Sequence, residues 1–482
     1  MIKLAIFHAV PRMARGEDLM PPLGIGHIIS CLKQRVSGVE IAFFRDADEV
    51  ISWHPDVLGV SCDTIGIMFA REQVRHIREE LPICIFLAGV HNSSMPLNLA
   101  PEFDFGVVGE GEMTMCELVE LFKVTLKPDS SSLAKICGLN YREAGQVLLS
   151  PPRPNIEDLD ILPPPDRDVL GTYEAPSWRM VHMLTSRGCP FQCAFCSSSA
   201  LWSGLRYFSP QRVVNDMIAL REKYDPVQIF IFDDLMVANK ARFRELCKLM
   251  KETRVHDGIM FRMQVRANLM TDELADLLWD LHFHEIDFGI ESNSAPVLKW
   301  LNKRGVTPDV NQHAMDVMRS HNLSAGASLI IGTPHETQDD IQTNWDFVQR
   351  NLDVINRVGC GILMPLPATR VWDEALAGGI VSDDMDFSIY GWNFWPDDQR
   401  LEALPRYPLM AQNVSGEELW QWIKKFEGLR DSLIKDAEIR CWHRLFYDTR
   451  QAWRRERDEL ARLKGSRLIR MAQGLRDVLG HK

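Results

Sequence analysis

Three cysteines lie close together in the run Gly188-Cys189-Pro190-Phe191-Gln192-Cys193-Ala194-Phe195-Cys196. This C-x3-C-x2-C spacing, in a loop directly after a predicted strand, lets three thiolates surround a single iron–sulfur cluster. Three protein ligands for a cluster of four irons leave one iron open, and an open position is how a metal site admits a substrate. The spacing therefore predicts that Cys189, Cys193 and Cys196 are both metal ligands and catalytic residues.

A structural zinc ion is the main alternative for these cysteines. Such a zinc ion takes four Cys or His ligands, and the serines that follow the motif, Ser197–Ser199, offer none. The other eight of the eleven cysteines are scattered singly, so metal binding explains the cluster of cysteines better than disulfides do. The apolar stretch Met1–Val10 is too short for an export signal, and no later run would span a membrane, so we expect a cytoplasmic protein.

The elements that must position the cysteine loop alternate between strands and helices, as in parallel α/β proteins. In the first part of the chain, apolar runs predict strands at Lys3–His8, Val57–Ser61, Ile83–Ala88 and Phe105–Val108. Helical periodicity predicts helices at Gly24–Gln34, Ala70–Glu80 and Met113–Val124. Further along, strands are predicted at Met180–Thr185, Gln228–Phe232, Arg262–Ala267, Glu285–Ile290, Ala327–Ile331 and Arg357–Met364. Six strands in βα order are fewer than the eight of a closed barrel, which indicates a partial barrel.

A chain of 482 residues is expected to fold as several domains. We predict a Rossmann-like domain at residues 1–150, a proline-rich linker at 151–175, a partial barrel at 176–385 and a helical domain at 386–482. The linker contains two proline-rich runs, which cannot continue a helix or a central strand. The composition is that of an ordinary globular protein, and the net charge of −12 argues against nucleic-acid binding.

Further motifs occur in a fixed order around the cysteines. They are Pro22-Leu23-Gly24-Ile25-Gly26, Gly106-Val107-Val108-Gly109-Glu110-Gly111-Glu112, Leu162–Asp166, Phe232-Asp233-Asp234, Gly289-Ile290-Glu291-Ser292, Ile331-Gly332-Thr333-Pro334 and Met364-Pro365-Leu366-Pro367-Ala368-Thr369. With these motifs, residues 1–385 resemble the radical S-adenosylmethionine (SAM) superfamily, and specifically the group with an N-terminal cobalamin-binding-type domain. The resemblance implies an α/β fold with a Rossmann-like cobalamin-binding-type domain, a partial (β/α)6 radical SAM barrel and a C-terminal helical region.

The resemblance also implies a reaction and a set of cofactor contacts. The open iron of a 4Fe–4S cluster would chelate the amino and carboxylate groups of SAM, and reductive cleavage would give a 5′-deoxyadenosyl radical that the protein shields from water. Phe195 would pack near the adenine, and Asp233 and Asp234 would accept hydrogen bonds from the ammonium group of SAM. Arg266, at the end of the third barrel strand, would meet a carboxylate.

Four more residues at barrel strand ends are implied as SAM contacts. Glu291 and Ser292 would bind ribose hydroxyls or other polar ends, and Ile331 and Gly332 would line the adenine. Structural roles stay open beside the functional ones. Asp234 suits a helix cap and Ile331 suits the core, while Arg266 equally suits a structural ion pair.

Cobalamin binding by the first domain rests on residues at or just past the predicted strand ends, most of them small. These residues are Ser61, Gly89, Gly109, Glu110 and Gly111. The Asp-x-His-x-x-Gly pattern, which supplies a histidine to cobalt in other proteins, is absent, although many members of this group bind cobalamin without it. The alternative is a domain that keeps the fold and has lost the ligand.

The chain departs from the family pattern at a few positions. Asn293 and Ala368 stand where the family often has glycine. Asparagine tolerates a positive φ better than most residues do, so the first change is expected to be mild. The second indicates a locally altered loop. In the first domain, Ala88-Gly89-Val90-His91 stands where relatives usually show two glycines.

The C-terminal region is predicted to form two long helices, Ser415–Arg440 and Trp442–Leu479. Between Arg440 and Lys482, twelve Lys or Arg residues face five Asp or Glu residues, and apolar residues recur at helical spacing. Such a basic amphipathic helix could lie on an anionic membrane, but packing on its own domain is the favoured interpretation.

The leading hypothesis is a cobalamin-dependent radical methyltransferase that methylates an unactivated carbon of a small-molecule, lipid or peptide substrate. Such a carbon is no nucleophile, so it cannot attack the sulfonium of SAM directly. An electron donor such as flavodoxin or ferredoxin would reduce the cluster. A radical cyclase or rearrangement enzyme without net methyl transfer is the second hypothesis, and a cobalamin or redox sensor without turnover is the third.

Overall fold

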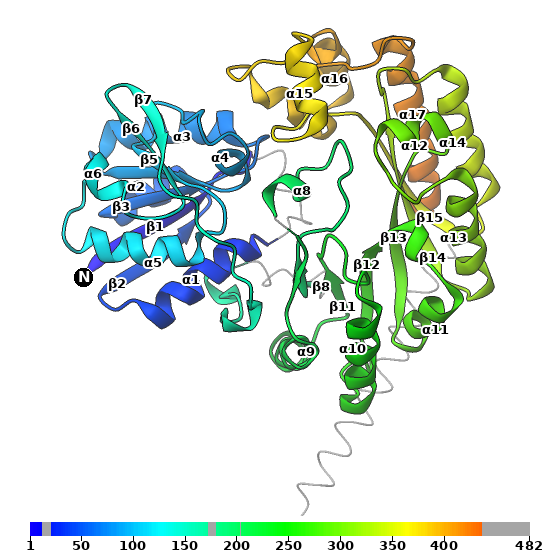
Figure 1. Cartoon of the computed structure of the whole chain (residues 1–482), viewed down its shortest axis with the longest axis horizontal. Helices are drawn as coiled ribbons and strands as arrows, with labels where there is room; N and C mark the ends of the chain where they lie inside the picture. Colours follow the sequence, from blue (N-terminus) through cyan, green and yellow to red (C-terminus); the bar gives the residue numbers. More distant parts are fainter. Residues whose placement is uncertain (12–20, 172–179, 203, 436–482) are drawn as a thin grey trace, which may run out of the picture.

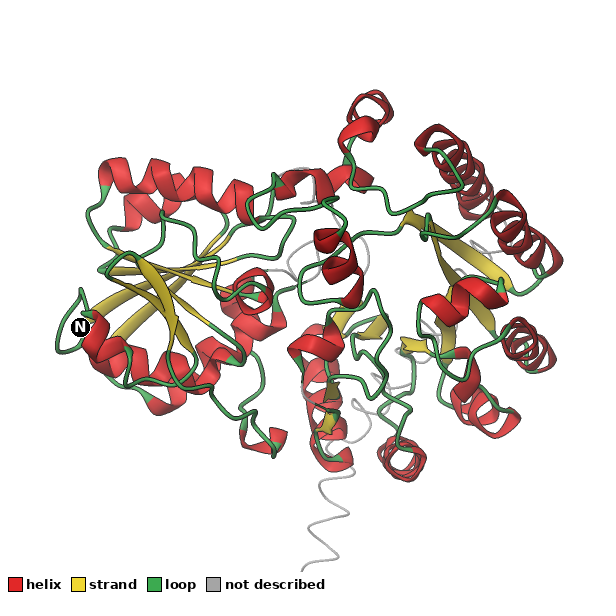
Figure 2. Cartoon of the chain, turned by 45° about the horizontal axis from the view of Figure 1, so that its top comes forward, coloured by secondary structure: helices red, strands yellow, loops and turns green. Residues whose placement is uncertain are grey.

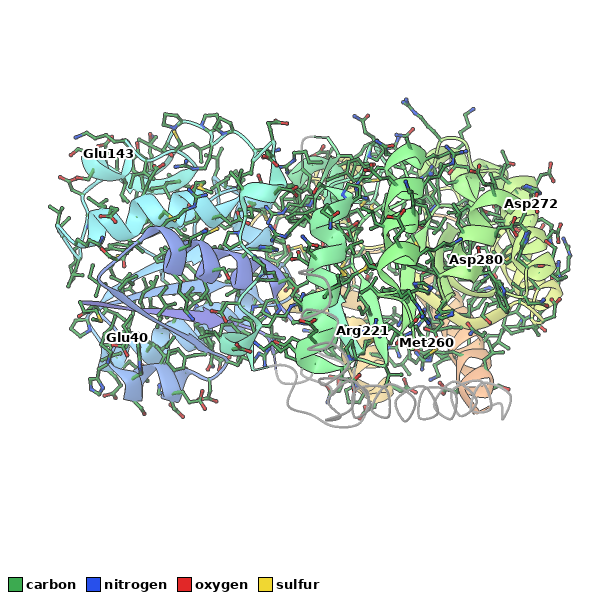
Figure 3. The ribbon with its side chains drawn as sticks, turned by 90° about the horizontal axis from the view of Figure 1, so that it is seen from below. Glu40, Glu143, Arg221, Met260, Asp272 and Asp280 are labelled. Carbon is green, nitrogen blue, oxygen red and sulfur yellow. The ribbon has the colours of Figure 1, made fainter. Side chains whose placement is uncertain are left out.

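The computed structural model describes residues 1–11, 21–171, 180–202 and 204–435, and most of its strands form two large sheets (Figure 1). The first sheet belongs to the N-terminal part of the chain and the second to the middle part. The short helix α8 (Ser198–Leu201), which directly follows the cysteine motif, lies between them (Figure 1). Figure 3 shows this division from below, with Glu40 and Glu143 on the first half and Met260 and Asp272 on the second.

The first sheet has seven strands in the order β2-β1-β3-β4-β5-β6-β7. Strands β1 to β5 are parallel, and β6 and β7 are antiparallel. Their bounds are β1 (Ile2–His8), β2 (Val39–Phe44), β3 (Val57–Ser61), β4 (Cys84–Ala88), β5 (Phe105–Val107), β6 (Leu139–Glu143) and β7 (Gln146–Leu149). The order of the parallel strands is that of a doubly wound sheet, whose ligands bind beyond the carboxyl ends of the strands.

Helices cover both faces of the first sheet. They are α1 (Leu23–Arg35), α2 (Ala47–Trp53), α3 (Ile67–Glu80), α4 (Val90–Ser94), α5 (Gly111–Phe122) and α6 (Ser130–Leu133). Neighbouring residues of a strand point to opposite faces. Ile6 therefore shares a hydrophobic core with α1 and α5, while Phe7 shares another with α2 and α3.

The second sheet has six parallel strands in the order β15-β14-β13-β12-β11-β8. Their bounds are β8 (Met180–Met183), β11 (Gln228–Ile231), β12 (Met260–Val265), β13 (Phe283–Glu291), β14 (Ser324–Ile331) and β15 (Ile355–Ile362). All six overlap the strands predicted from the sequence, and the sheet curves into the expected partial barrel.

Six helices connect these strands on the outer side of the barrel (Figure 2). They are α9 (Pro210–Tyr224), α10 (Lys240–Thr253), α11 (Asp272–Asp280), α12 (Ala295–Trp300), α13 (Pro308–Ser320) and α14 (Gln338–Arg350). The side chains of Ser209, Asn239, Thr271, Thr307 and Thr337 cap five of them by accepting a backbone N–H of the first turn. These caps explain why the helices begin at these residues.

The proline-rich segment, predicted as a linker, packs against both halves. It contains the 3-10 turn η2 (Leu159–Ile161) and the short helix α7 (Arg167–Leu170). Ser30 of α1 donates a hydrogen bond to the Pro164 carbonyl at 2.6 Å, while Leu159 and Leu162 belong to the core of the barrel. The segment thus joins the two halves through its own packing, and the domain boundaries proposed from the sequence stay predictions.

The C-terminal described residues continue the barrel. The elements are α15 (Arg370–Ala377), η4 (Phe387–Phe394), α16 (Asp397–Ala403), η5 (Leu404–Arg406) and α17 (Gly416–Lys435). Helix α17, which corresponds to the first predicted C-terminal helix, packs on β15 and contributes Phe426 to the barrel core. The predicted helix Trp442–Leu479 and the basic region lie outside the described residues. Within the described part, no helix combines the length and the apolarity needed to cross a membrane.

Candidate active site between the two sheets

The cysteine loop emerges from a small two-stranded ribbon, β9 (Ser186–Arg187) and β10 (Arg206–Tyr207). Gly188, the next residue, has φ of 89°. A Cβ atom there would stand 2.2 Å from the Gly204 carbonyl oxygen and 3.0 Å from Cβ of Trp202. Only glycine therefore fits directly before Cys189, because a side chain would collide with Trp202 and Gly204 and would also strain the backbone.

The far side of the loop is held by hydrogen bonds from the ends of two barrel helices. The Ala194 N–H donates to the Leu301 carbonyl at 2.9 Å, and the Val371 N–H donates to the Ala194 carbonyl at 3.2 Å. The Asn302 side chain donates to the Gln192 carbonyl at 2.5 Å. The loop that carries the cysteines is thus fixed at both ends before any cofactor binds.

Arg266 contacts the loop directly. Its Nη1 lies 3.4 Å from Sγ of Cys193, and its Nη2 donates to the Arg304 carbonyl at 2.7 Å. The guanidinium also lies over the Phe191 ring, 4.0 Å from the ring centroid. Arg266 therefore lies beside Cys193, and its predicted contact with a carboxylate stays a prediction.

The three cysteines suit a cluster better than a single metal ion. Burial raises the pKa of the Cys189 and Cys196 thiols, so they need a metal to become thiolates at neutral pH. Across the described ranges, no three His, Cys, Asp or Glu side chains come close enough to hold one ion. The cysteines of a cluster each bind a different iron, so they need not converge on one point. This arrangement disfavours the zinc alternative.

Asp233 and Asp234 have different surroundings although they are neighbours. Asp233 is buried and accepts hydrogen bonds from the Thr185 N–H at 2.6 Å and from the hydroxyls of Thr185 and Ser186. Its carboxylate thus ties the end of β11 to the end of β8. Asp234 accepts hydrogen bonds from the Ser198 side chain at 2.8 Å and from the Gly188 backbone, and it lines a cavity. Burial raises the pKa of both carboxyls.

Glu291 and Ser292, predicted to bind the ribose, already have protein partners. The Glu291 carboxylate accepts a hydrogen bond from Lys303 at 2.7 Å in a buried ion pair. The Ser292 hydroxyl is fully buried, donates to Asn344 at 3.1 Å and accepts from the Ser294 N–H at 3.1 Å. These contacts favour the structural reading of both residues, and any contact with SAM stays a prediction.

Ile331, Gly332 and Phe195 lie around one hydrophobic core. Ile331 is fully buried in it, and Phe195 packs against it. Gly332 has φ of 88°, and a Cβ there would stand 3.2 Å from Leu419 of α17. Its N–H donates to the buried carboxyl of Glu336 at 2.5 Å. Ile331 and Phe195 thus belong to the same large hydrophobic core, and the contact of these residues with the adenine stays a prediction.

The two departures from the family pattern have different explanations. Ala368 adopts φ of 65°, a conformation that glycine enters far more easily. Asn293 does not need the tolerance for positive φ that the sequence suggested. The residue with positive φ in that motif is Glu291, at 60°, while the Asn293 N–H donates to Asn344.

The five first-domain residues predicted to bind cobalamin line one cavity of about 470 Å³. They are Ser61, Gly89, Gly109, Glu110 and Gly111. From the other half of the molecule, Gly188 and Asp234 line the same cavity, so it joins the carboxyl ends of the first sheet to the cysteine loop. Its inner part runs between Ile6, Gly59 and Phe86 of the sheet and the helices α1 and α5, and its size is typical of an organic-ligand site.

Glu110 has a role that the sequence analysis missed. Its carboxylate accepts hydrogen bonds from Arg187 at 2.6 Å, from Arg206 at 2.9 Å and from the Ile156 N–H at 2.7 Å. Glu112 pairs with the same Arg187 at 2.6 Å. All four charged side chains are buried. Burial alone would raise the pKa of Glu110, but the bonds from Arg206 and Arg187 hold it below its usual value.

We call this group of four, Glu110, Glu112, Arg187 and Arg206, the interdomain clasp. It fixes the rim of the cavity to the residue that directly precedes Gly188. Glu112 and Arg187 are 75 residues apart in the chain. An ion pair over that separation has no local sequence pattern, although the Gly109–Glu112 turn and Arg187 beside the cysteine motif were visible hints.

Comparisons with known proteins agree with this arrangement. The family model for the Radical SAM superfamily matches residues 183–348. The chain is 31% identical over 377 residues to the uncharacterized methyltransferase PH0819 of Pyrococcus horikoshii, which covers 75% of this chain and 80% of that protein. It is 25% identical over 446 residues to an anaerobic magnesium-protoporphyrin IX monomethyl ester cyclase of Rubrivivax gelatinosus, covering 87% and 77% of the two chains.

A solved structure shares the fold. The radical SAM methyltransferase TsrM of Kitasatospora setae, determined with cobalamin and a 4Fe–4S cluster bound, superimposes with a TM-score of 0.64 at 18% identity. The match covers 78% of this chain and 75% of that one. The expected α/β fold class, a Rossmann-like domain followed by a partial barrel, is therefore confirmed.

A partial barrel with three cysteines at one edge defines a radical SAM enzyme, and the cofactors of that class are a 4Fe–4S cluster and SAM. More narrowly, the chain belongs to the family of radical SAM enzymes that carry an N-terminal cobalamin-binding-type domain. The resemblance inferred from the motifs is thereby confirmed.

Proposed function

We propose that this chain is a cobalamin-dependent radical SAM methyltransferase that methylates an unactivated carbon of a small-molecule, lipid or peptide substrate. One observation carries the proposal: a single cavity is lined by Ser61, Gly89 and Gly109 of the first half and by Gly188 and Asp234 of the second. A ligand in that cavity would lie directly beside the cysteine loop. The methyltransferase names of two compared proteins support the same conclusion.

The residues around the cavity fit a bulky, mostly apolar cofactor. A Cβ atom at Gly24 or Gly109 would meet nothing within 4 Å, so these glycines leave space where side chains would intrude. Ile6, Ile25 and Phe86 provide apolar walls. We assign the cobalamin site to this cavity, and the cluster site to Cys189, Cys193 and Cys196.

The residues of the chain position these groups. When bound, the cluster and SAM supply a 5′-deoxyadenosyl radical that removes hydrogen from the substrate, and cobalamin supplies the methyl group. The clasp holds Arg187, and with it Gly188 and Cys189, at a fixed place against the cavity rim. Arg266 donates an N–H to Cys193 and so helps to hold this part of the loop in place.

A radical cyclase is the second candidate, because the similarity to the Rubrivivax gelatinosus cyclase extends over 87% of this chain. A cyclase would share the cluster, SAM and the radical, and it would differ in transferring no methyl group. Formation of S-adenosylhomocysteine therefore separates the two candidates, since only methyl transfer produces it.

The proposal is tested on anaerobically purified and reconstituted protein with dithionite as the reductant. The wild-type protein should form 5′-deoxyadenosine and show a corrinoid absorption spectrum. Cys193→Ala should abolish 5′-deoxyadenosine formation, because the cluster loses one of three ligands. Cys137→Ala, which removes a single half-buried thiol elsewhere, should leave it unchanged.

Three outcomes would count against the proposal. A wild-type protein without 5′-deoxyadenosine formation would act as a sensor rather than an enzyme. A Cys193→Ala protein with intact cleavage would refute the cluster assignment. With a turned-over substrate, 5′-deoxyadenosine without S-adenosylhomocysteine would favour the cyclase.

A further inference from the structure

Two stretches of chain without carboxylates contribute to a basic surface beside the cysteine loop. Residues 292–308 contain Lys299, Lys303 and Arg304 but neither Asp nor Glu, and residues 185–209 also lack both acids. The whole chain, in contrast, carries a net charge of −12. A local positive region on an acidic protein creates a field that attracts a negatively charged partner.

Hydrogen bonds connect this surface closely to the cluster site. Leu301 and Asn302 hold the cysteine loop through Ala194 and Gln192. The Arg304 carbonyl accepts Nη2 of Arg266, whose Nη1 lies 3.4 Å from Sγ of Cys193. Arg266 thus connects the backbone of this surface, at Arg304, directly to the predicted cluster ligand Cys193.

The charges of the surface face outward. Lys299 and Arg304 are exposed, and within the described residues neither has a carboxylate partner. Arg304 donates only to the neutral side chain of Asn302, at 3.0 Å. Arg370, also exposed, has one acidic neighbour, Glu374, at 3.4 Å. Lys303 is buried with Glu291 and adds no free charge.

The surface also has a shape that a partner can enter. A depression of about 270 Å³ is lined by Leu298, Lys299, Asn302 and Arg304. Beside it, Pro190 and Gln192 form the exposed tip of the cysteine loop, and Gln192 directly precedes Cys193. We call Pro190, Gln192, Lys299, Arg304 and Arg370 the cluster-side patch.

We propose that the cluster-side patch is the docking surface for a low-potential electron-carrier protein with an acidic face. This inference rests on the proposed function, which requires the cluster to be reduced before SAM is cleaved. The carrier gives up one electron, and the cluster takes it up, changing from the 2+ to the 1+ state. Docking on the patch brings the carrier next to Gln192, one residue from a cluster ligand, and opposite charges steer its approach.

The test compares a protein donor with a small one. Full-length wild-type protein and the double variant Lys299→Glu/Arg304→Glu are reconstituted with cluster, and 5′-deoxyadenosine formation is followed. The donor is either a purified acidic flavodoxin, kept reduced by its reductase and NADPH, or dithionite. With flavodoxin, the variant should show kcat/KM for the donor lowered about tenfold, because charge reversal at a docking surface acts mainly on association. With dithionite, its rate should equal that of wild type.

A matched control reverses two charges elsewhere on the barrel. Lys248 and Arg254 are exposed near the C-terminal end of α10, and the Arg254 carbonyl accepts a hydrogen bond from Arg221 on the underside of the molecule (Figure 3). Lys248→Glu/Arg254→Glu should leave both reactions unchanged. The wild-type rate with flavodoxin should also fall with rising salt, because salt screens attraction between exposed charges.

The outcomes separate this inference from the proposed function. A cluster-side variant that is as fast as wild type with flavodoxin would overturn the docking surface, as would a variant equally slow with both donors. Equal losses in the control and cluster-side variants would also overturn it, since they would indicate a general effect of net charge. Failure of wild-type protein to form 5′-deoxyadenosine with dithionite would instead refute the proposed function.

Discussion

At the carboxyl end of the first sheet, the chain places Ser61, Gly89 and Gly109 around an open cavity. At the carboxyl end of the second sheet, it places Asp233 and Glu291, and their carboxylates already accept hydrogen bonds from the protein. The first set was predicted from the rule that ligands bind beyond the carboxyl ends of parallel strands, and the second set, implied by the family resemblance, also lies at strand ends. The two ends therefore follow one topological rule and differ in how their side chains are used.

The difference teaches which residue types report a binding site reliably. A small residue at a strand end leaves space, so several of them in sequence predict a cavity with little ambiguity. A carboxylate at a strand end can serve a ligand or the fold, and the sequence does not separate the two uses. Asp233 and Asp234 are adjacent, yet the first ties two strands together and the second faces the cavity.

Glu110 is the exception that tests this comparison most strongly, because it lies among the small residues but behaves like the acids of the second sheet. Replacing Glu110 by Ala removes one carboxylate from the buried Arg187, which keeps Glu112. It also removes from Arg206 the only paired carboxylate among the described residues, and it leaves the Ile156 N–H without its acceptor. Removing one partner of a buried ion pair lowers the free energy of unfolding by about 3–5 kcal/mol, because the other charge stays buried without compensation. We expect Glu110→Ala to lower the urea midpoint, measured by tryptophan fluorescence, by a corresponding amount.

The control for this prediction lies on the same helix. Glu117 of α5 is half-exposed and pairs with Arg153 at 2.7 Å. Exposed ion pairs contribute little, so Glu117→Ala should cost less than about 1 kcal/mol. Similar midpoints for the two variants would mean that the clasp does not hold the halves together.

Much of the fold could be predicted because its patterns are local. The six barrel strands are apolar runs bounded by polar segments, and the capping residues mark the helix starts within a turn. Three strands of the first sheet were missed. Strand β2 (Val39–Phe44) is mostly half-exposed and follows no clear alternation, and β6 and β7 form a short hairpin that pairs with an edge. Strands β2 and β7 are the edges of the sheet and bury less apolar surface, so their sequence pattern is weaker, while β6 is mostly buried but only five residues long.

In the candidate site too, the features with a local sequence pattern could be predicted and the long-range contacts could not. The cysteines and the glycines are defined by spacing and by the absence of side chains, and both features can be seen in sequence. The clasp, the Lys303–Glu291 pair and the contact of Arg266 with Cys193 join residues that are far apart in the chain or on different elements. Those contacts depend on tertiary packing and leave no mark on local sequence.

Gly111, the residue after Glu110, should give the opposite result from its neighbour. It lines the cavity without positive φ, and a Cβ there would stand 3.1 Å from the end of the flexible Ile28 side chain and in ordinary contact with Val107 at 3.8 Å. Gly111→Leu should therefore keep the fold and fill part of the cavity. Steric overlap of this kind costs about 1–3 kcal/mol of binding free energy, so corrinoid affinity should fall about tenfold or more.

The measurement is the corrinoid absorbance per polypeptide, taken together with the iron content and the urea midpoint. Gly428→Leu, on the exposed side of α17 where a Cβ meets nothing within 4 Å, is the matched control. It should leave corrinoid, iron and stability unchanged. A Gly111→Leu protein with full corrinoid content would show that the cofactor binds elsewhere, and a loss of iron as well would point to a collapsed site.

The smallest expected effect concerns Glu336, a buried acid at the second sheet. It accepts hydrogen bonds from the N–H groups of Gly332 and Thr333, and burial raises its pKa to about 7. The folded chain therefore binds this proton more tightly than the unfolded chain does, and the free energy of unfolding falls as pH rises from the unfolded pKa to the folded one. Between pH 6 and pH 8 the remaining loss is about 1 kcal/mol.

Glu336→Gln removes the titration and keeps an oxygen that can accept both N–H groups. The free energy of unfolding of wild type, measured by urea titration, should thus fall relative to that of the variant by about 1 kcal/mol between pH 6 and pH 8, because only the wild type must give up a buried proton. Glu402→Gln, at an exposed position of α16, should show no such divergence. Parallel pH profiles for wild type and Glu336→Gln would mean that this acid is ionised in the folded chain. The contrast between the open cavity at the first sheet and the carboxyl groups used by the fold at the second sheet would then not extend to the loop after β14.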